Sequence, residues 1–154
     1  PFTLQFLFTT LAGLLLGGRL GALSVAVYLV LGLVGAPVFT EGGGPAYLLK
    51  PSFGYLIGFM LGAWLTGKIA FSARRLSFKL AVAASVAGLA AVYLCGMAYC
   101  YLISNFVLAQ PLSFEALFIY CFLLAVPGDI LLCFVGALIA VRLAERSPLR
   151  YARS

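Results

Sequence analysis

Long, nearly unbroken runs of apolar residues dominate the chain, and short polar or glycine-rich segments separate them. The runs are residues 4–18, 21–36, 54–72, 80–103 and 114–143. They do not alternate with period two, so they predict helices and not strands. A helix needs about 20 apolar residues to cross a bilayer core, so the first two runs are short for a full crossing. The pattern predicts five membrane helices, the last one kinked at Pro127.

The composition supports this interpretation. Of the 154 residues, 64% are hydrophobic and 9% are charged, whereas an ordinary soluble domain is about 45–50% apolar and about 25% charged. A chain of this size cannot hide so much apolar surface from water. A soluble globular domain, a disordered chain and a nucleic-acid binder are therefore excluded. We expect an all-α integral membrane protein with a single domain over residues 1–154.

The basic residues predict an orientation, because cytoplasmic loops carry an excess of Lys and Arg. If the basic loop 73–79 is cytoplasmic, alternation of the helices places every basic residue except Lys50 on or near that side. This accounts for the net charge of +6. The basic tail 146–154 is then cytoplasmic and the loop 37–53 is extracellular. With five spans the N-terminus starts outside, which leads us to expect one further helix upstream.

Residue types that carry catalysis or bind metals are scarce. The chain has no histidine, and its four cysteines lie in apolar runs without a CxxC pair, so we expect no metal site and no cofactor. Residues 62–68 (GAWLTGK) fit the pattern GxxxxGK, but Ile69 follows and the stretch lies in a hydrophobic helix. There is no nucleophile–base set. An enzyme is not expected, and any ATP-driven step must come from partner proteins.

Asp129 is the main candidate for a functional residue. It lies in the last apolar run, where an ionisable group is costly and by default functional. Pro127 and Gly128 beside it can free backbone groups and widen a cavity at the same depth. The alternative is a buried structural carboxylate that pairs with a donor elsewhere in the bundle.

The loop 37–53 is the second candidate, and its length suggests a lid. Glu41 precedes three glycines, 42–44, which let a backbone approach a ligand closely. Lys50 can pair with an anionic group on a ligand. The alternative is an ordinary exposed loop with a solvated lysine. Rings flank the loop at Phe39, Tyr47 and Phe53, and hydrogen-bonding side chains lie at the outer end of the first run at Thr3 and Gln5.

Small residues recur four apart, a spacing that lets helix backbones approach closely. This predicts either packing inside the bundle or a surface on which another membrane protein docks. The residues concerned are Gly13, Gly17 and Gly21, then Gly58 and Gly62, then Ala84 and Gly88.

Several separated motifs, in the same order, resemble the BioY family of biotin transporters, and together they span nearly the whole chain. They are PFTLQ at 1–5, LAGLLLG at 11–17, GALS at 21–24, LGLVGAPVF at 31–39, GGG at 42–44, KPSFGYLIGF at 50–59 and PGD at 127–129. The resemblance implies a prokaryotic plasma-membrane protein, the substrate-binding S component of an energy-coupling factor (ECF) vitamin transporter. Its family fold has six transmembrane helices, of which this chain would hold five, without the first. The implied partners are biotin, membrane lipids, a transmembrane T component and two ABC-type ATPases.

The resemblance also implies roles for individual residues. Asp129 is expected to accept from the ureido N–H groups of biotin, and Gln5 or Thr3 to donate to the ureido oxygen. Lys50 is expected near the valerate carboxylate. The family often has a lysine three residues after the aspartate of PGD, and here that position is Leu132, so Lys50 or the ligand's N–H groups would balance Asp129. The remaining expected contacts are Ser52, Tyr55, Glu41, Gly43, Phe39 and Tyr47.

Three other functions are weighed beside biotin binding. An S component for a different small vitamin would share the fold and change the cargo. A membrane scaffold subunit would bind no cargo at all, which the glycine-rich outer loop and the acid within an apolar run argue against. A membrane enzyme is disfavoured because catalytic residue sets are missing.

Overall fold

A computed structural model describes residues 4–37, 42–50, 53–73, 76–107, 114–119, 123 and 126–146 of the chain. The elements within these ranges are helical, which confirms the predicted all-α class. They are α1 (Leu4–Leu16), α2 (Gly18–Leu33), the 3-10 helix η1 (Pro45–Leu49), α3 (Phe53–Ala70), α4 (Phe78–Leu102), its π-helical continuation η2 (Ile103–Val107), α5 (Phe114–Phe118) and α6 (Val126–Arg146).

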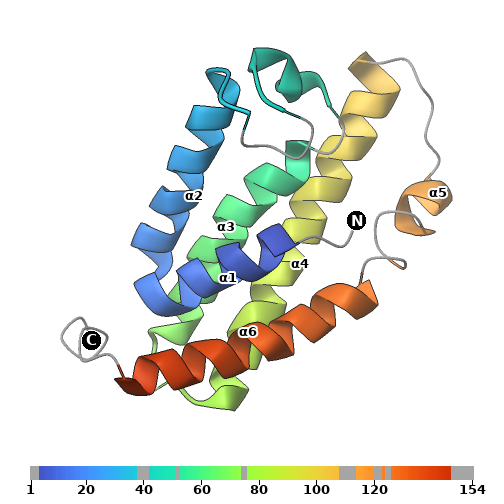
Figure 1. The fold of residues 1–154 in the computed structure, drawn as a ribbon. Helices are drawn as coiled ribbons and strands as arrows, with labels where there is room; N and C mark the ends of the chain where they lie inside the picture. Colours follow the sequence, from blue (N-terminus) through green and yellow to red (C-terminus); the bar gives the residue numbers. More distant parts are fainter. Residues whose placement is uncertain are drawn as a thin grey trace.

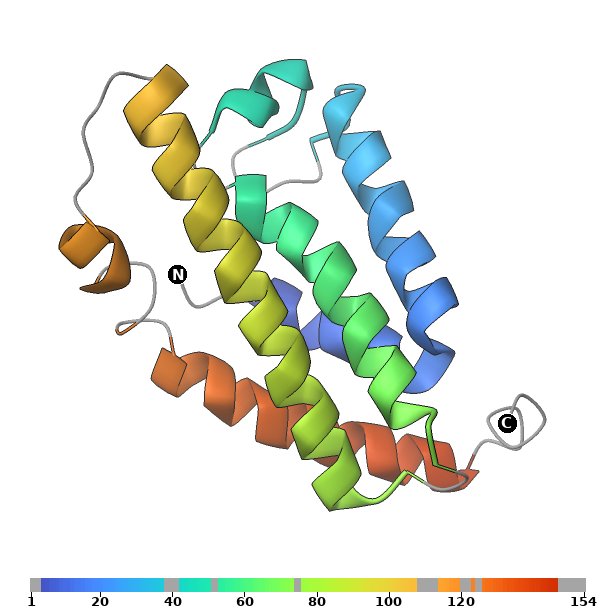
Figure 2. The same ribbon diagram turned by 180° about the vertical axis from the view of Figure 1, so that it is seen from behind.

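The helices form two layers. In Figure 1, α2, α3 and α4 stand side by side, and α1 and α6 cross in front of them; Figure 2 shows the same two layers from behind. Helix α3 lies in the middle and packs against α1, α2 and α4, while α6 packs against α1 and α4. Helix α1 therefore crosses the upright helices between their ends, and α6 begins beside α4 (Figures 1 and 2).

Three of the described helices are long and apolar enough to cross a membrane. They span Phe53–Ala70, Phe78–Val107 and Val126–Ala144, and two shorter apolar helices cover Gln5–Leu16 and Gly18–Leu33. Helices α1 and α2 are therefore short, as the lengths of the first two apolar runs predict. Ser77 is the N-cap of helix α4, because its hydroxyl oxygen accepts a hydrogen bond from the Leu80 N–H at 3.1 Å.

The turn between α1 and α2 depends on glycine. Gly17 has φ of 90°, a left-handed conformation that other residues rarely adopt. Across from the turn, Gly67 of α3 lies so close that a Cβ atom there would overlap the backbone of Gly17 and Gly18. The turn between α1 and α2 is therefore tight, and it packs directly on α3.

The other closely spaced small residues also pack inside the bundle. A Cβ on Gly58 would lie 2.9 Å from the backbone of Val92, and one on Gly62 would lie 2.8 Å from the Gly88 carbonyl oxygen. Beside them, the Thr66 hydroxyl of α3 donates to the Ala84 carbonyl oxygen of α4 at 3.0 Å. The closely spaced small residues of α3 and α4 therefore pack these two helices against each other. At these positions the structure supports packing inside the bundle over a docking surface for another protein.

The prediction of one kinked helix over residues 114–143 was wrong. The structure has a short α5 that ends at Phe118 and a separate α6 that begins at Val126. Pro127 lies in the first turn of α6, where its missing N–H is not needed and its ring does not clash with a preceding turn. The proline thus starts the last helix and does not bend it.

The two ends of the bundle differ in charge. The α1–α2 turn, the end of α3, the start of α4 and the end of α6 lie toward one end (Figures 1 and 2), and Arg19, Lys68, Lys79 and Arg142 are on these segments. Lys50 follows η1 at the opposite end. The fold therefore groups these residues as the charge pattern predicts.

Candidate functional site

Asp129 is buried in the first turn of α6, where the positive end of the helix dipole favours a carboxylate. It is 6% exposed and is the one buried residue of formal charge among the described residues. The Tyr93 hydroxyl of α4 donates a hydrogen bond to Asp129 Oδ2. A carboxylate has two oxygens that each accept more than one hydrogen bond, so this contact leaves capacity for further donors.

Tyr93 also connects Asp129 to a residue predicted to contact the ligand. Its ring packs edge to face against Tyr55 of α3, with the centroids 6.3 Å apart and an interplanar angle of 89°. The Tyr55 ring lies over Gly96, where a Cβ atom would be 2.5 Å from the ring. The structure thus brings Tyr55 and Asp129 together through Tyr93, which was not among the predicted site residues. The signal for it was a hydroxyl inside an apolar run, since a buried tyrosine O–H usually finds a partner.

The helix η1 is fixed to the bundle by aromatic contacts. Tyr47 is 6% exposed and packs edge to face on Phe53, with centroids 6.3 Å apart. Phe53 packs in turn against Tyr99 at 5.9 Å. The Tyr99 hydroxyl donates to the Leu48 carbonyl oxygen, which ties α4 back to η1. Part of the loop 37–53 is therefore an ordered helical turn that covers the end of α3.

Lys50 lies directly beside this turn. Its Nζ atom is 4.7 Å from the centroid of the Tyr47 ring, a cation–π arrangement. Two of the predicted site residues, Lys50 and Tyr47, are thus in contact, and the charge is held at the end of the bundle where η1 lies.

Gln5 contacts a third tyrosine. At the start of α1, Gln5 Nε2 donates to the Tyr28 hydroxyl of α2 at 2.9 Å. One N–H of the Gln5 amide is therefore used within the bundle, and the amide has a second N–H donor. Tyr28 was not predicted, because nothing in the sequence separation of 23 residues indicates the pairing.

Gly43 has a packing role in the structure. The N–H of the following Gly44 donates to the Gly32 carbonyl oxygen of α2 at 2.7 Å, and a Cβ on Gly43 would overlap the Ala36 carbonyl oxygen. The glycines thus let the loop lie against the end of α2. The other predicted contacts, Thr3, Phe39, Glu41 and Ser52, lie outside the described residues.

One apolar cluster joins these groups. It contains Leu132, which stands where the resemblance expected a lysine and which is buried. Within the described residues, no group of three or more His, Cys, Asp or Glu side chains could hold a metal ion. Ring faces with hydroxyl tips, one buried carboxylate and one cation suit a small molecule with an apolar body and few polar groups. The aromatic members of the cluster are Phe6, Tyr28, Tyr47, Phe53, Tyr55, Phe59, Tyr93 and Tyr99.

Comparison with known proteins places the chain in a family. The model of the BioY family matches residues 1–148, and this chain belongs to that family. A probable biotin transporter BioY from Lysinibacillus sphaericus is 43% identical over 143 residues, which cover 93% of this chain and 73% of the relative. One from Pyrococcus horikoshii is 37% identical over 147 residues, 95% of this chain and 79% of the relative.

A solved structure gives the same result at the level of the fold. The crystal structure of the S-component for biotin from an ECF-type ABC transporter superposes with a TM-score of 0.77 at 30% identity. The match covers 96% of this chain and 77% of that one. The family resemblance and the all-α membrane fold predicted from the sequence are confirmed.

Proposed function

We propose that this chain is the biotin-binding S component of an ECF-type transporter. The proposal is supported by the family, by relatives named as biotin transporters and by the biotin S-component with the same fold. BioY is a family of transporter components, so the chain is not an enzyme. The observation that carries the proposal is the buried Asp129, whose one hydrogen bond from Tyr93 leaves acceptor capacity beside an aromatic wall.

The chemistry of biotin matches these side chains. Its ureido ring carries two N–H donors, which a carboxylate accepts with charge-assisted hydrogen bonds. Asp129 takes this end, and the Gln5 amide donates to the ureido oxygen. The apolar thioether ring packs on the rings of Tyr55 and Tyr93, and the valerate carboxylate points to Lys50 at the end where η1 lies.

Energy for uptake must come from other subunits. The GxxxxGK stretch lies inside helix α3, not in a phosphate-binding loop between a strand and a helix. In this proposal a transmembrane T component and two ABC-type ATPases dock on the chain and supply the ATP-driven step. Co-purification of the four subunits, with ATP-dependent biotin uptake by vesicles that contain them, tests this arrangement; uptake by the chain alone at the same rate contradicts it.

The charged end of the bundle faces the cytoplasm in this proposal, and the loop 37–53 covers the ligand from outside. Single cysteines in a cysteine-free background test the orientation, with Leu48→Cys on η1 and Ser72→Cys after α3, both exposed positions. A membrane-impermeant maleimide applied to intact cells should label the first and spare the second. The reverse pattern contradicts the orientation.

The cargo is tested by titrating the purified chain in detergent with biotin, thiamine and riboflavin. Saturable binding and a thermal shift with biotin alone are expected. A response to another vitamin makes the chain an S component for that vitamin. No response to any of them favours the scaffold subunit.

A further inference from the structure

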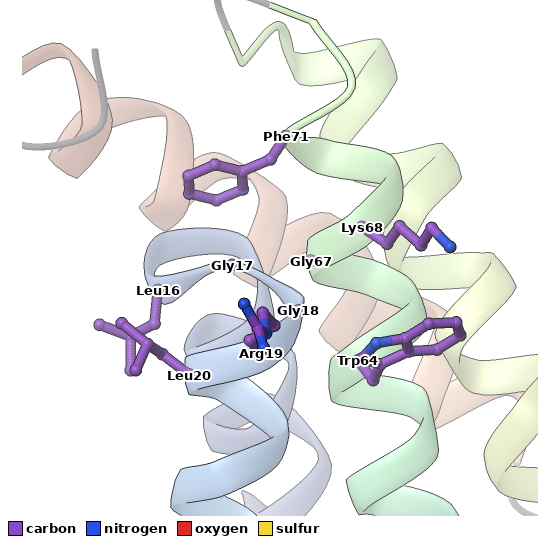
Figure 3. Close-up of a pocket in the computed structure, with 9 residues that line it drawn as sticks. All are labelled: Leu16, Gly17, Gly18, Arg19, Leu20, Trp64, Gly67, Lys68 and Phe71. Atoms are coloured by element: carbon purple, nitrogen blue, oxygen red, sulfur yellow. The ribbon is translucent and has the colours of Figure 1, made fainter. Parts of the chain in front are cut away.

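A pocket lies at the end of the bundle away from the biotin site. It has a volume of about 590 Å³ and lies where the α1–α2 turn meets the second half of α3 (Figure 3). Its floor is the tight contact between Gly67 and the backbone of Gly17 and Gly18. Because backbone packs on backbone there, this floor is fixed by the fold, and the walls are formed by side chains.

Two cations line this pocket. Arg19 and Lys68 are both exposed, and neither forms an ion pair with a residue in the described ranges. Lys68 Nζ lies 4.7 Å from the centroid of the Trp64 ring, which also lines the pocket. The pocket thus offers positive charge to an anion and a large amphipathic ring beside it.

The rest of the lining is apolar. Leu16, Leu20 and Phe71 contribute hydrocarbon surface, and Leu16 and Leu20 are exposed. These residues are at the ends of α1 and α3 and at the start of α2, which is the depth where an apolar helix meets lipid headgroups. Tryptophan is enriched at that depth, and basic residues mark the leaflet that carries anionic lipids.

We propose that this pocket binds the headgroup of an anionic phospholipid. The lipid phosphate pairs with Arg19, Lys68 beside the Trp64 ring adds positive charge at the rim, and the first methylenes of its chains cover Leu16, Leu20 and Phe71. The occupant is a lipid and not a soluble anion, because the pocket joins its cations to an apolar wall. This site does not depend on biotin, so its test stands apart from that of the transport function.

Trp64 is the chain's one tryptophan, so its fluorescence reports on this pocket. The chain is reconstituted in phosphatidylcholine vesicles with increasing brominated phosphatidylglycerol, and in parallel with increasing brominated phosphatidylcholine. Bromine quenches tryptophan at contact distance. The anionic lipid should quench at a lower mole fraction than the neutral one, by about fivefold for each cation engaged. Equal quenching by the two lipids overturns the proposal.

Matched variants separate this pocket from general attraction to a basic surface. Arg19→Gln and Lys68→Gln should each lower the preference for phosphatidylglycerol about fivefold, measured against the unquenched signal of the same variant. Lys79→Gln removes the same charge from an exposed position on α4 that does not line the pocket, and it should leave the preference unchanged. An equal loss in all three variants overturns the proposal. So does relief of the quenching by an excess of inorganic phosphate, because the site then takes a soluble anion.

Discussion

The two halves of the bundle are packed in different ways. The cluster near η1 contains large rings, with Tyr47, Phe53 and Tyr93 buried in it. The cluster at the opposite end is built from small residues, with Ala81, Ala84, Ala137 and Ala140 fully buried. Both halves are apolar enough for a membrane. The ring-rich half places tyrosine hydroxyl groups and a carboxylate in the interior. Beside the alanines, the buried hydroxyls of Thr66 and Ser85 donate to backbone carbonyl oxygens, and no buried carboxylate lies there among the described residues.

Helix α6 runs through both halves. Its first turn carries Asp129, and its later turns carry Ala137, Ala140 and Ala144. Small residues let helices approach until their backbones touch, which gives a firm contact and leaves no room for a ligand between those two helices. Large rings hold helices apart and offer faces and hydroxyl tips. The difference suggests that one half holds the helices together while the other receives the ligand.

The largest effect is expected from removing the carboxylate in the ring-rich half. Asp129→Ala leaves the ureido N–H donors of biotin unpaired in a buried site, so the affinity should fall by about 3 kcal/mol or more, roughly a hundredfold. Glu115→Ala is the matched control, because it removes a carboxylate from an exposed position on α5. Isothermal titration measures both variants. An Asp129→Ala affinity within about threefold of the wild type, less than 1 kcal/mol, rules out the assigned role.

The next effect is expected in the alanine-rich half and on stability alone. Gly67→Ala forces a methyl group into the backbone of the α1–α2 turn, which should cost about 1–3 kcal/mol of unfolding free energy. Gly136→Ala is the control, because its methyl group would meet the movable end of Leu7 at 3.3 Å. Thermal unfolding in detergent compares the two, and the biotin affinity of folded Gly67→Ala protein should match the wild type. A large loss of affinity without a loss of stability contradicts the division between the halves.

A smaller effect is expected for Tyr93→Phe. This change keeps the ring that packs on Tyr55 and removes the hydroxyl that donates to Asp129. A hydrogen bond to a charged group contributes about 1.5–3 kcal/mol, and part of it is replaced by the ligand's donors, so we expect about a tenfold loss of biotin affinity. Tyr101→Phe on the same helix, an exposed position, serves as the control. Unchanged binding in Tyr93→Phe means that the hydroxyl plays no part in positioning the carboxylate.

The smallest effect is expected for Lys50→Gln. Lys50 is half-buried beside Tyr47, and exposed ion pairs contribute about 0.2–1 kcal/mol, so the affinity for biotin should fall about two- to fivefold. The loss should shrink for biotin amide, which lacks the valerate charge. An equal loss with both ligands shows that Lys50 acts through packing and not through the carboxylate.

The sequence predicted the helices well where the cause is local. Apolar runs gave α1 to α4 to within a few residues, and Ser77 and Gly17 mark helix ends by their own chemistry. The last run failed because hydrophobicity does not reveal a break, and Pro127 fits the start of a helix as well as a kink. A proline in an apolar run therefore fixes a boundary or a bend, and only the tertiary structure decides which.

The site was predictable only in part. Asp129 is conspicuous in the sequence because a charge in an apolar run is costly, and the structure shows it buried; its contact with biotin stays a prediction. Its partner Tyr93 lies 36 residues away, and the pairing depends on how α4 and α6 cross. Gly43 stays a predicted ligand contact, and its packing against the end of α2 could not be read from the sequence. Spacing within one helix can be read from a sequence, whereas contacts between helices cannot.

The most direct test of the central claim, that the ring-rich half receives the ligand, is a structure of this chain with biotin bound. We predict a ureido nitrogen at about 2.7–2.9 Å from an Asp129 carboxylate oxygen, within charge-assisted hydrogen-bond distance, and the thioether ring against Tyr55 and Tyr93. Biotin bound among the alanines of the other half, or anywhere without a contact to Asp129, would contradict the account.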